Sequence, residues 1–165
     1  MNIVNTISHQ PFQLQLIPLR PIKLFILRLE IERFITAQEN TFDKAFAELQ
    51  NGRKQSHWMW YIFPQIEGLG NSETAKFYAI KNLQEANDYL KHSVLGERLI
   101  KISNLLLLSK ADNAYEIFGS PDDMKLRSSM TLFASISKTD SVFHLVLKKF
   151  FNGKADEKTL TIINK

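Results

Sequence analysis

Hydrophobic residues recur with the period of an α-helix along most of this chain of 165 residues, and this period limits its fold more than any other feature. Residues at i, i+3, i+4 and i+7 lie on one face of a helix. One such face consists of Phe42, Ala45, Phe46 and Leu49, and the spacing returns between Leu95 and Leu106. No alternation of strand and helix patterns indicates a parallel sheet. The chain is therefore predicted to be mainly α-helical.

Capping residues set the expected helix boundaries. Helix starts are predicted at Thr41, Ser72, Asn82, Ser93, Ser120, Asp140 and Asp156. Ser120 gives the clearest signal, because a proline and two acids follow it, as at the N-terminus of many helices. The pair Asn152-Gly153 is typical of a helix end. Together these signals predict a compact, single-domain orthogonal array of about six to eight helices.

The excess of positive charge lies at the N-terminus of the chain. The first 28 residues hold no acid and three cations, which are Arg20, Lys23 and Arg28. From Glu30 onward the net charge is only +1. Binding to a phosphate backbone needs several clustered cations, so the near-neutral body argues against nucleic acid as a partner.

The apolar, basic N-terminal stretch is predicted to be an extension that precedes the helical body. Prolines and cations interrupt the apolar runs of the extension before they reach the roughly 18 residues of a membrane span. We therefore expect no membrane partner.

Cysteine is absent, which excludes disulfides, thiolate metal sites and a cysteine nucleophile, and fits a cytoplasmic location. No two of the four histidines have the short spacing of a metal-binding helix, so no metal site is expected. The composition indicates no particular cofactor.

Between Gly52 and Gly70 the helical pattern lapses, and here lies the tryptophan segment, Ser56–Gln65, which begins SHWMW. It contains both tryptophans of the chain, Trp58 and Trp60. Aromatic walls with a few polar anchors are typical of ligand pockets, although aromatic clusters also fill cores.

Two polar residues of the tryptophan segment have predicted roles. The side chain of Gln65 is the expected hydrogen-bonding anchor of a ligand. His57 is the expected proton-transfer group, because imidazole titrates near neutral pH. A lone histidine is also often a structural group with its hydrogen bonds satisfied.

The second candidate is the lysine segment, Lys125–Met130, with the sequence KLRSSM. Lys125 and Ser129 share a helical face at i and i+4, and Ser128 lies beside them. A hydroxyl and a cation on one face suit a phosphate or a carboxylate. Small serines also simply allow close helix packing, and no glycine-flanked turn marks either serine as a nucleophile.

The sequence resembles a bacterial and fungal family catalogued as domain of unknown function eighteen-ten. The resemblance covers roughly residues 29–163 and rests on Ser56–Trp60, Phe63–Gln65, Gly68–Gly70, Ile117–Gly119, Asp122–Asp123, Lys125–Phe133 and Phe150–Gly153. It implies a compact, mainly helical fold and no particular activity. It also implies the domain organisation, with an N-terminal extension over residues 1–28 outside the match and one helical domain over residues 29–165. Because the tryptophan and lysine segments both mark the family, we expect them to meet around one pocket.

These observations favour a small-molecule pocket protein, with or without catalysis. A small polar or phosphorylated ligand would lie between Trp58 and Trp60 on one side and Lys125, Ser128 and Ser129 on the other. The alternative is a protein-interaction module in which the aromatic residues form an exposed surface. Nucleic-acid binding is the least favoured possibility.

Overall fold

A computed structural model describes residues 30–165. The predicted N-terminal extension, residues 1–28, lies outside the described residues. Within them the chain is mainly helical, and its only strand-like pairing is one parallel bridge between Ile66 and Ile80.

The described residues form ten helices. The first, α1, covers residues 30–39. The others are α2 (Phe42–Gln50), α3 (Met59–Ile62), α4 (Glu73–Phe77), α5 (Leu83–Lys91), α6 (Leu95–Leu108), α7 (Ala114–Phe118), α8 (Asp122–Ser135), α9 (Val142–Phe151) and α10 (Glu157–Ile163). The predicted six to eight helices are therefore too few. The prediction missed α3 and α7, because helices of four and five residues are too short to show a period.

Several predicted helix starts carry the expected cap. The side chains of Ser72, Asn82 and Asp156 each accept a hydrogen bond from the backbone N–H three residues on. The predicted helix start at Ser93 is wrong, because α6 begins after Val94. The backbone N–H groups of Val94 and Leu95 donate to His92 Nδ1 and not to the Ser93 hydroxyl.

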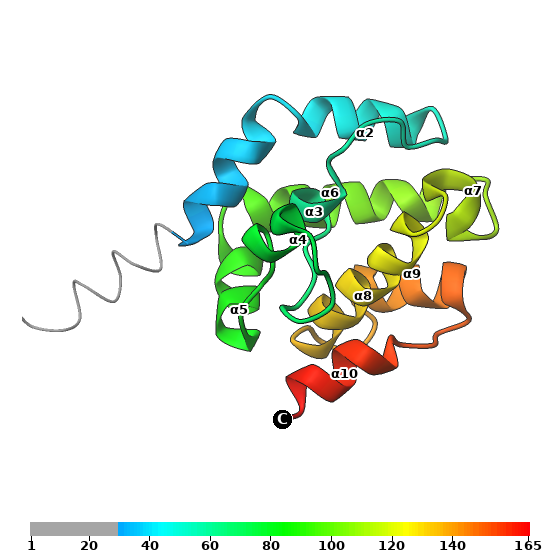
Figure 1. Cartoon of the computed structure of the whole chain (residues 1–165). Coiled ribbons are helices and arrows are strands. Elements are labelled where there is room, and N and C mark those ends of the chain that lie inside the picture. The colour runs from blue at the N-terminus through cyan, green and yellow to red at the C-terminus, as the bar shows by residue number, and fades with distance from the viewer. Residues whose placement is uncertain (1–29) are drawn as a thin grey trace, which may run out of the picture.

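Helix α8 lies at the centre of the packing and contacts α5, α7, α9 and α10 (Figure 1). Its fully buried residues Leu126, Met130 and Phe133 belong to a single hydrophobic cluster. Helix α6 joins the same cluster from the other side, against α2, α5 and α9. The candidate segments are thus attached to one shared core.

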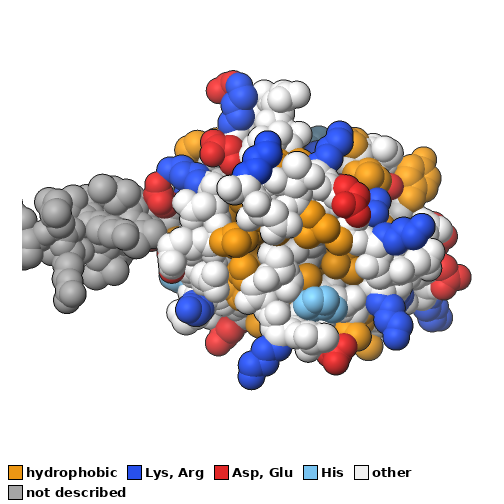
Figure 2. All heavy atoms as spheres, turned by 90° about the horizontal axis from the view of Figure 1, so that it is seen from below, with side chains coloured by type: hydrophobic (Ala, Val, Ile, Leu, Met, Phe, Trp, Pro, Cys, Tyr) orange, Lys and Arg blue, Asp and Glu red, His pale blue; other side chains and the backbone are white. Residues whose placement is uncertain are grey.

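None of the helices within residues 30–165 combines the length and the apolar character that crossing a bilayer requires. Figure 2 shows the face seen from below, where charged side chains lie mainly around the rim and hydrophobic side chains are exposed nearer the middle.

Candidate functional site

The loop that leads into the tryptophan segment is held by the carboxylate of Glu48 on α2. Glu48 accepts hydrogen bonds from the backbone N–H groups of Gln55 and Ser56, at 2.8 and 3.0 Å, and from the Ser56 hydroxyl. It also accepts one from Trp58 Nε1, at 2.8 Å. Burial alone would raise the pKa of Glu48, but these four donors outweigh it and lower the pKa to about 2. Glu48 therefore stays ionised and fixes the loop.

The two tryptophans of the segment face different surroundings. Trp58 is only 1% exposed and packs in the core against Phe63 and Phe118. Trp60, two residues on and on the single turn of α3, is partly exposed and lines a pocket. Only Trp60 is therefore available to a ligand.

The carboxylate of Asp122 links the lysine segment to Lys54, which lies two residues before the tryptophan segment. Its Oδ2 lies 2.6 Å from Lys54 Nζ and its Oδ1 lies 2.7 Å from Lys125 Nζ. The Lys54 ammonium lies 5.2 Å from the centre of the Trp58 ring, and that of Lys125 lies 4.9 Å from the Trp60 ring. One carboxylate thus holds two cations, each over a different tryptophan.

Asp122 is ionised in this arrangement. Partial burial would raise its pKa, but the hydrogen bonds and charges of Lys125 and Lys54 lower the pKa below its ordinary value of 3.8. At neutral pH the three groups together carry one net positive charge.

A pocket of about 430 Å³ opens between α3, α4, α8 and the start of α10. This volume lies within the range of about 300 to 1,000 Å³ of small-molecule sites. Its lining combines apolar and polar side chains, namely Trp60, Gln65, Leu69, Gly70, Asn71, Ser72, Ala75, Pro121, Met124, Lys125, Ser128, Asp156 and Lys158. We call it the α8 pocket.

Four residues proposed from sequence line the α8 pocket together, and they are Trp60, Gln65, Lys125 and Ser128. Gly70 explains the close approach of the wall, since a Cβ atom there would lie 2.5 Å from that of Ala75.

The other three predicted site residues lie elsewhere. Trp58 and Ser129 are buried in the core, and neither is part of the pocket lining. His57 is exposed outside the lining, with its ring stacked on that of Trp60 at a centroid distance of 6.4 Å. Ser129 lies about 100° further round α8 than Ser128, and on that side of the helix its side chain is fully buried in the core.

Ser128 connects α8 to the start of α10. Its hydroxyl donates to either the Met124 carbonyl, at 3.2 Å, or Asp156 Oδ2, at 3.1 Å. Asp156 also accepts from the backbone N–H and the hydroxyl of Thr159. Asp156 is therefore both the N-cap of α10 and a carboxylate of the pocket.

Sequence reasoning missed the site roles of Lys54, Asp122 and Asp156. The sequence patterns indicated only a helix start for Asp122 and Asp156, and they indicated no role for Lys54. One signal was available for Asp122. It lies three residues before the predicted site residue Lys125, so that the two side chains can pair on one helical face.

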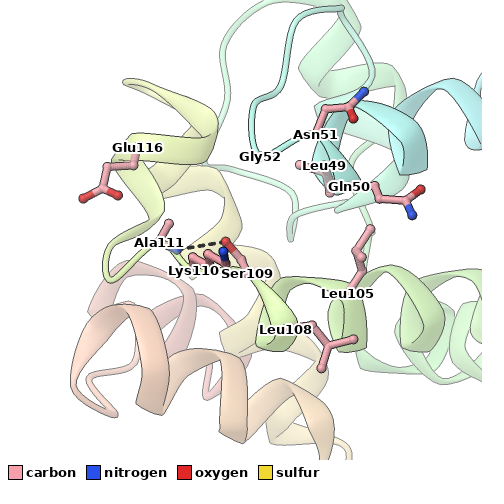
Figure 3. Close-up of a pocket in the computed structure, with 10 residues that line it drawn as sticks. All are labelled: Leu49, Gln50, Asn51, Gly52, Leu105, Leu108, Ser109, Lys110, Ala111 and Glu116. Atoms are coloured by element: carbon pink, nitrogen blue, oxygen red, sulfur yellow. Dashed lines mark hydrogen bonds between the residues drawn. The ribbon is translucent and has the colours of Figure 1, made fainter.

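A second, more open cavity of about 600 Å³ lies between the C-terminal ends of α2 and α6 and helix α7. Figure 3 shows its lining, in which the carboxylate of Glu116 and the amide of Gln50 point away from the space between them. Leu49, Leu105 and Leu108 supply an apolar part of the wall. Without converging polar groups this cavity is the weaker candidate.

No group of three or more histidine, aspartate or glutamate side chains in the described part of the chain lies close enough to hold an ion.

Residues 28–163 match a protein family described as "Protein of unknown function (DUF1810)". The chain belongs to this family. A solved structure, that of the conserved hypothetical protein Rv1873 from Mycobacterium tuberculosis, is 41% identical, with a TM-score of 0.80. The match covers 82% of this chain and 97% of the other. No curated protein matches the chain significantly. The family assignment therefore confirms the resemblance drawn from the motifs and supplies no activity.

Proposed function

We propose that this protein binds a small polar or phosphorylated metabolite in the α8 pocket. One observation carries the proposal: Trp60, Gln65, Lys125 and Ser128, chosen from two distant segments of the sequence, line one concave site. The site has the composition of a ligand pocket, an apolar wall with a few polar groups that fix orientation. Lys125 is the main anchor and Trp60 the main wall.

Two observations favour a pocket over an interaction surface. The tryptophan segment does not form an exposed aromatic face, because Trp58 and Phe63 are buried. The most exposed large hydrophobic residues, Phe77, Leu108 and Tyr115, lie on or beside three different helices. They offer no aromatic centre of the kind that dominates protein interfaces.

Binding is better supported than catalysis. No histidine lines the pocket, and the Asp156 oxygen that Ser128 contacts is already used to cap α10. The proton-transfer role of His57 stays a prediction, as does the cytoplasmic location favoured by the cysteine-free composition.

A thermal-shift screen of the full chain against nucleotides, sugar phosphates and other polar metabolites tests the proposal. A ligand at about a hundred times its Kd should raise the Tm by roughly 5 to 10 °C. Lys125→Ala should abolish most of this shift, whereas His57→Ala should retain it.

Lys44→Ala is the matched control, because Lys44 is an exposed lysine on α2 outside the α8 pocket. A ligand that stabilises Lys125→Ala as strongly as the Lys44→Ala control would show that it binds somewhere else.

A further inference from the structure

The cations of the α8 pocket are arranged for a ligand that carries a phosphate. Resting on the function proposed above, we infer that the occupant is a phosphorylated polyol, with its phosphate on Lys125 and its hydroxyl groups on Asp156 and Gln65. The inference depends on three features of the pocket: the partners of Lys125, the lack of a free arginine, and lining side chains whose hydrogen-bonding groups have no partner within residues 30–165.

Lys125 can turn to an anion without leaving a charge unpaired. Asp122 binds Lys54 through Oδ2 and Lys125 through Oδ1. If Lys125 Nζ moves to a phosphate, Lys54 remains on Asp122 with its side chain only 9% exposed. Breaking a partly buried ion pair is costly mainly when one partner is left alone, and here it is not.

The local charge also favours an anion. The site contains three cations and two carboxylates, and its net charge is therefore +1. The cations are Lys54, Lys125 and Lys158, and the carboxylates are those of Asp122 and Asp156. The charge of Asp156 is further offset because it caps α10, where the N-terminal N–H groups are exposed to it. An anionic ligand therefore meets an attractive field.

Lysine rather than arginine is the available cation, which favours phosphate over carboxylate. Arginine pairs with carboxylate and phosphate alike in a bidentate way, whereas a lysine ammonium acts as a compact point charge, which attracts a phosphate monoester of about −1.5 to −2 more strongly than a carboxylate of −1. Arg127, next to Ser128 in sequence, is occupied by the backbone carbonyls of Lys154 and Ala155, at 3.0 and 2.8 Å.

The remaining polar groups of the pocket suit hydroxyls. Asp156 uses Oδ2 for its contacts with Ser128 and Thr159, while its Oδ1 makes no hydrogen bond within the described residues. The side-chain amides of Gln65 and Asn71, which also line the pocket, make no hydrogen bond within residues 30–165. These acceptors and donors can bind a polyol carrier.

A nucleobase fits the pocket less well. Trp60 is the only aromatic residue in the lining of the α8 pocket, and His57 already stacks on its ring. Little ring surface is left for a base to stack on.

Calorimetric titration of the full chain with glucose 6-phosphate and ribose 5-phosphate tests the inference. Glucose, inorganic phosphate, gluconate and AMP serve as comparison ligands. A sugar phosphate should bind at least about tenfold more tightly than glucose or gluconate. Lys125→Gln should weaken its binding by about tenfold or more, and the charge-matched control Lys44→Gln should not.

The variant Asp156→Asn distinguishes binding of the polyol part of the ligand from binding of its phosphate. Asparagine keeps the N-cap of α10, so the fold is retained, but the variant loses the charged acceptor. It should reduce the preference for glucose 6-phosphate over inorganic phosphate, while phosphate itself binds at least as well as before.

Three results would overturn the inference. Equal binding of the sugar phosphates to wild type and Lys125→Gln would remove Lys125 as the anchor. Tighter binding of AMP or gluconate would change the ligand class. Absence of binding by every phosphate compound would also end the inference, but the proposed function would survive if another polar metabolite bound in a Lys125-dependent way.

Discussion

The carboxylate of Glu48 connects three backbone or hydroxyl donors and the indole of Trp58. It thereby fixes the loop from Gln55 to Trp58 and, through the chain, the position of α3 with Trp60. The site residue Trp60 is thus positioned by a side chain on α2 that touches no ligand.

Glu48→Gln should destabilise the fold. The glutamine amide N–H₂ would face donors that need an acceptor, and at least one buried donor would lose its partner. We expect a loss of about 1 to 3 kcal/mol in the free energy of unfolding, measured by urea denaturation. Glu32→Gln, at an exposed position of α1, should change it by less than about 0.5 kcal/mol.

Consecutive residues of the lysine segment on α8 have different roles. Leu126 and Met130 are fully buried in the core, while Lys125 and Ser128 line the pocket. The guanidinium of Arg127 donates hydrogen bonds to two backbone carbonyls of the loop before α10. The lysine segment was predicted to be a ligand site, but part of it serves to pack α8 against the core.

This division explains how far the sequence predicted the site. The start signals at Ser120 and Asp156 were enough to locate α8 and α10, although the N-cap of α8 is Pro121 and not Ser120. The odd composition of two segments was enough to choose Trp60 and Lys125. The pattern could not show which of Trp58 or Trp60 faces inward, because one turn of helix has no period. It also paired Lys125 with Ser129, whereas the pocket uses Ser128, because the orientation of α8 depends on its neighbours.

Gly96 tests the packing between α5 and α6. A Cβ atom at this position would lie 1.9 Å from the carbonyl oxygen of Leu90, so the two helices would have to move apart. Gly96→Ala should lower the free energy of unfolding by about 3 kcal/mol, despite the better helix propensity of alanine.

Asn104→Ala, at an exposed position of the same helix, is the control for Gly96→Ala and should be nearly neutral. An unchanged urea midpoint for Gly96→Ala would contradict the close approach of α5 and α6.

At the scale of the whole molecule, one hydrophobic core is shared by the elements that carry the pocket. Stability of this core and geometry of the site are therefore linked, and carboxylates that anchor the site should make the stability depend on pH. Both Glu48 and Asp122 have pKa values lowered by their partners.

The pH dependence has a definite sign. Glu48 ordinarily titrates at 4.5 and its pKa in the folded protein is about 2, so its contribution is complete above pH 4.5 and is lost as the pH falls toward 2. Wild type should lose up to about 3 kcal/mol from this group over that interval. In urea titrations across the same pH range, Glu48→Gln should show a flatter profile, and parallel profiles would contradict the role of Glu48.

The central claim is that a ligand binds in the α8 pocket, and mapping of backbone amide NMR shifts tests it most directly. The titrant is the strongest binder from the metabolite screen. We predict that the perturbed amides cluster at Trp60, Gln65, Gly70, Lys125 and Ser128. Perturbations confined to Gln50–Gly52 and Leu105–Ala111, around the cavity of Figure 3, would contradict the claim.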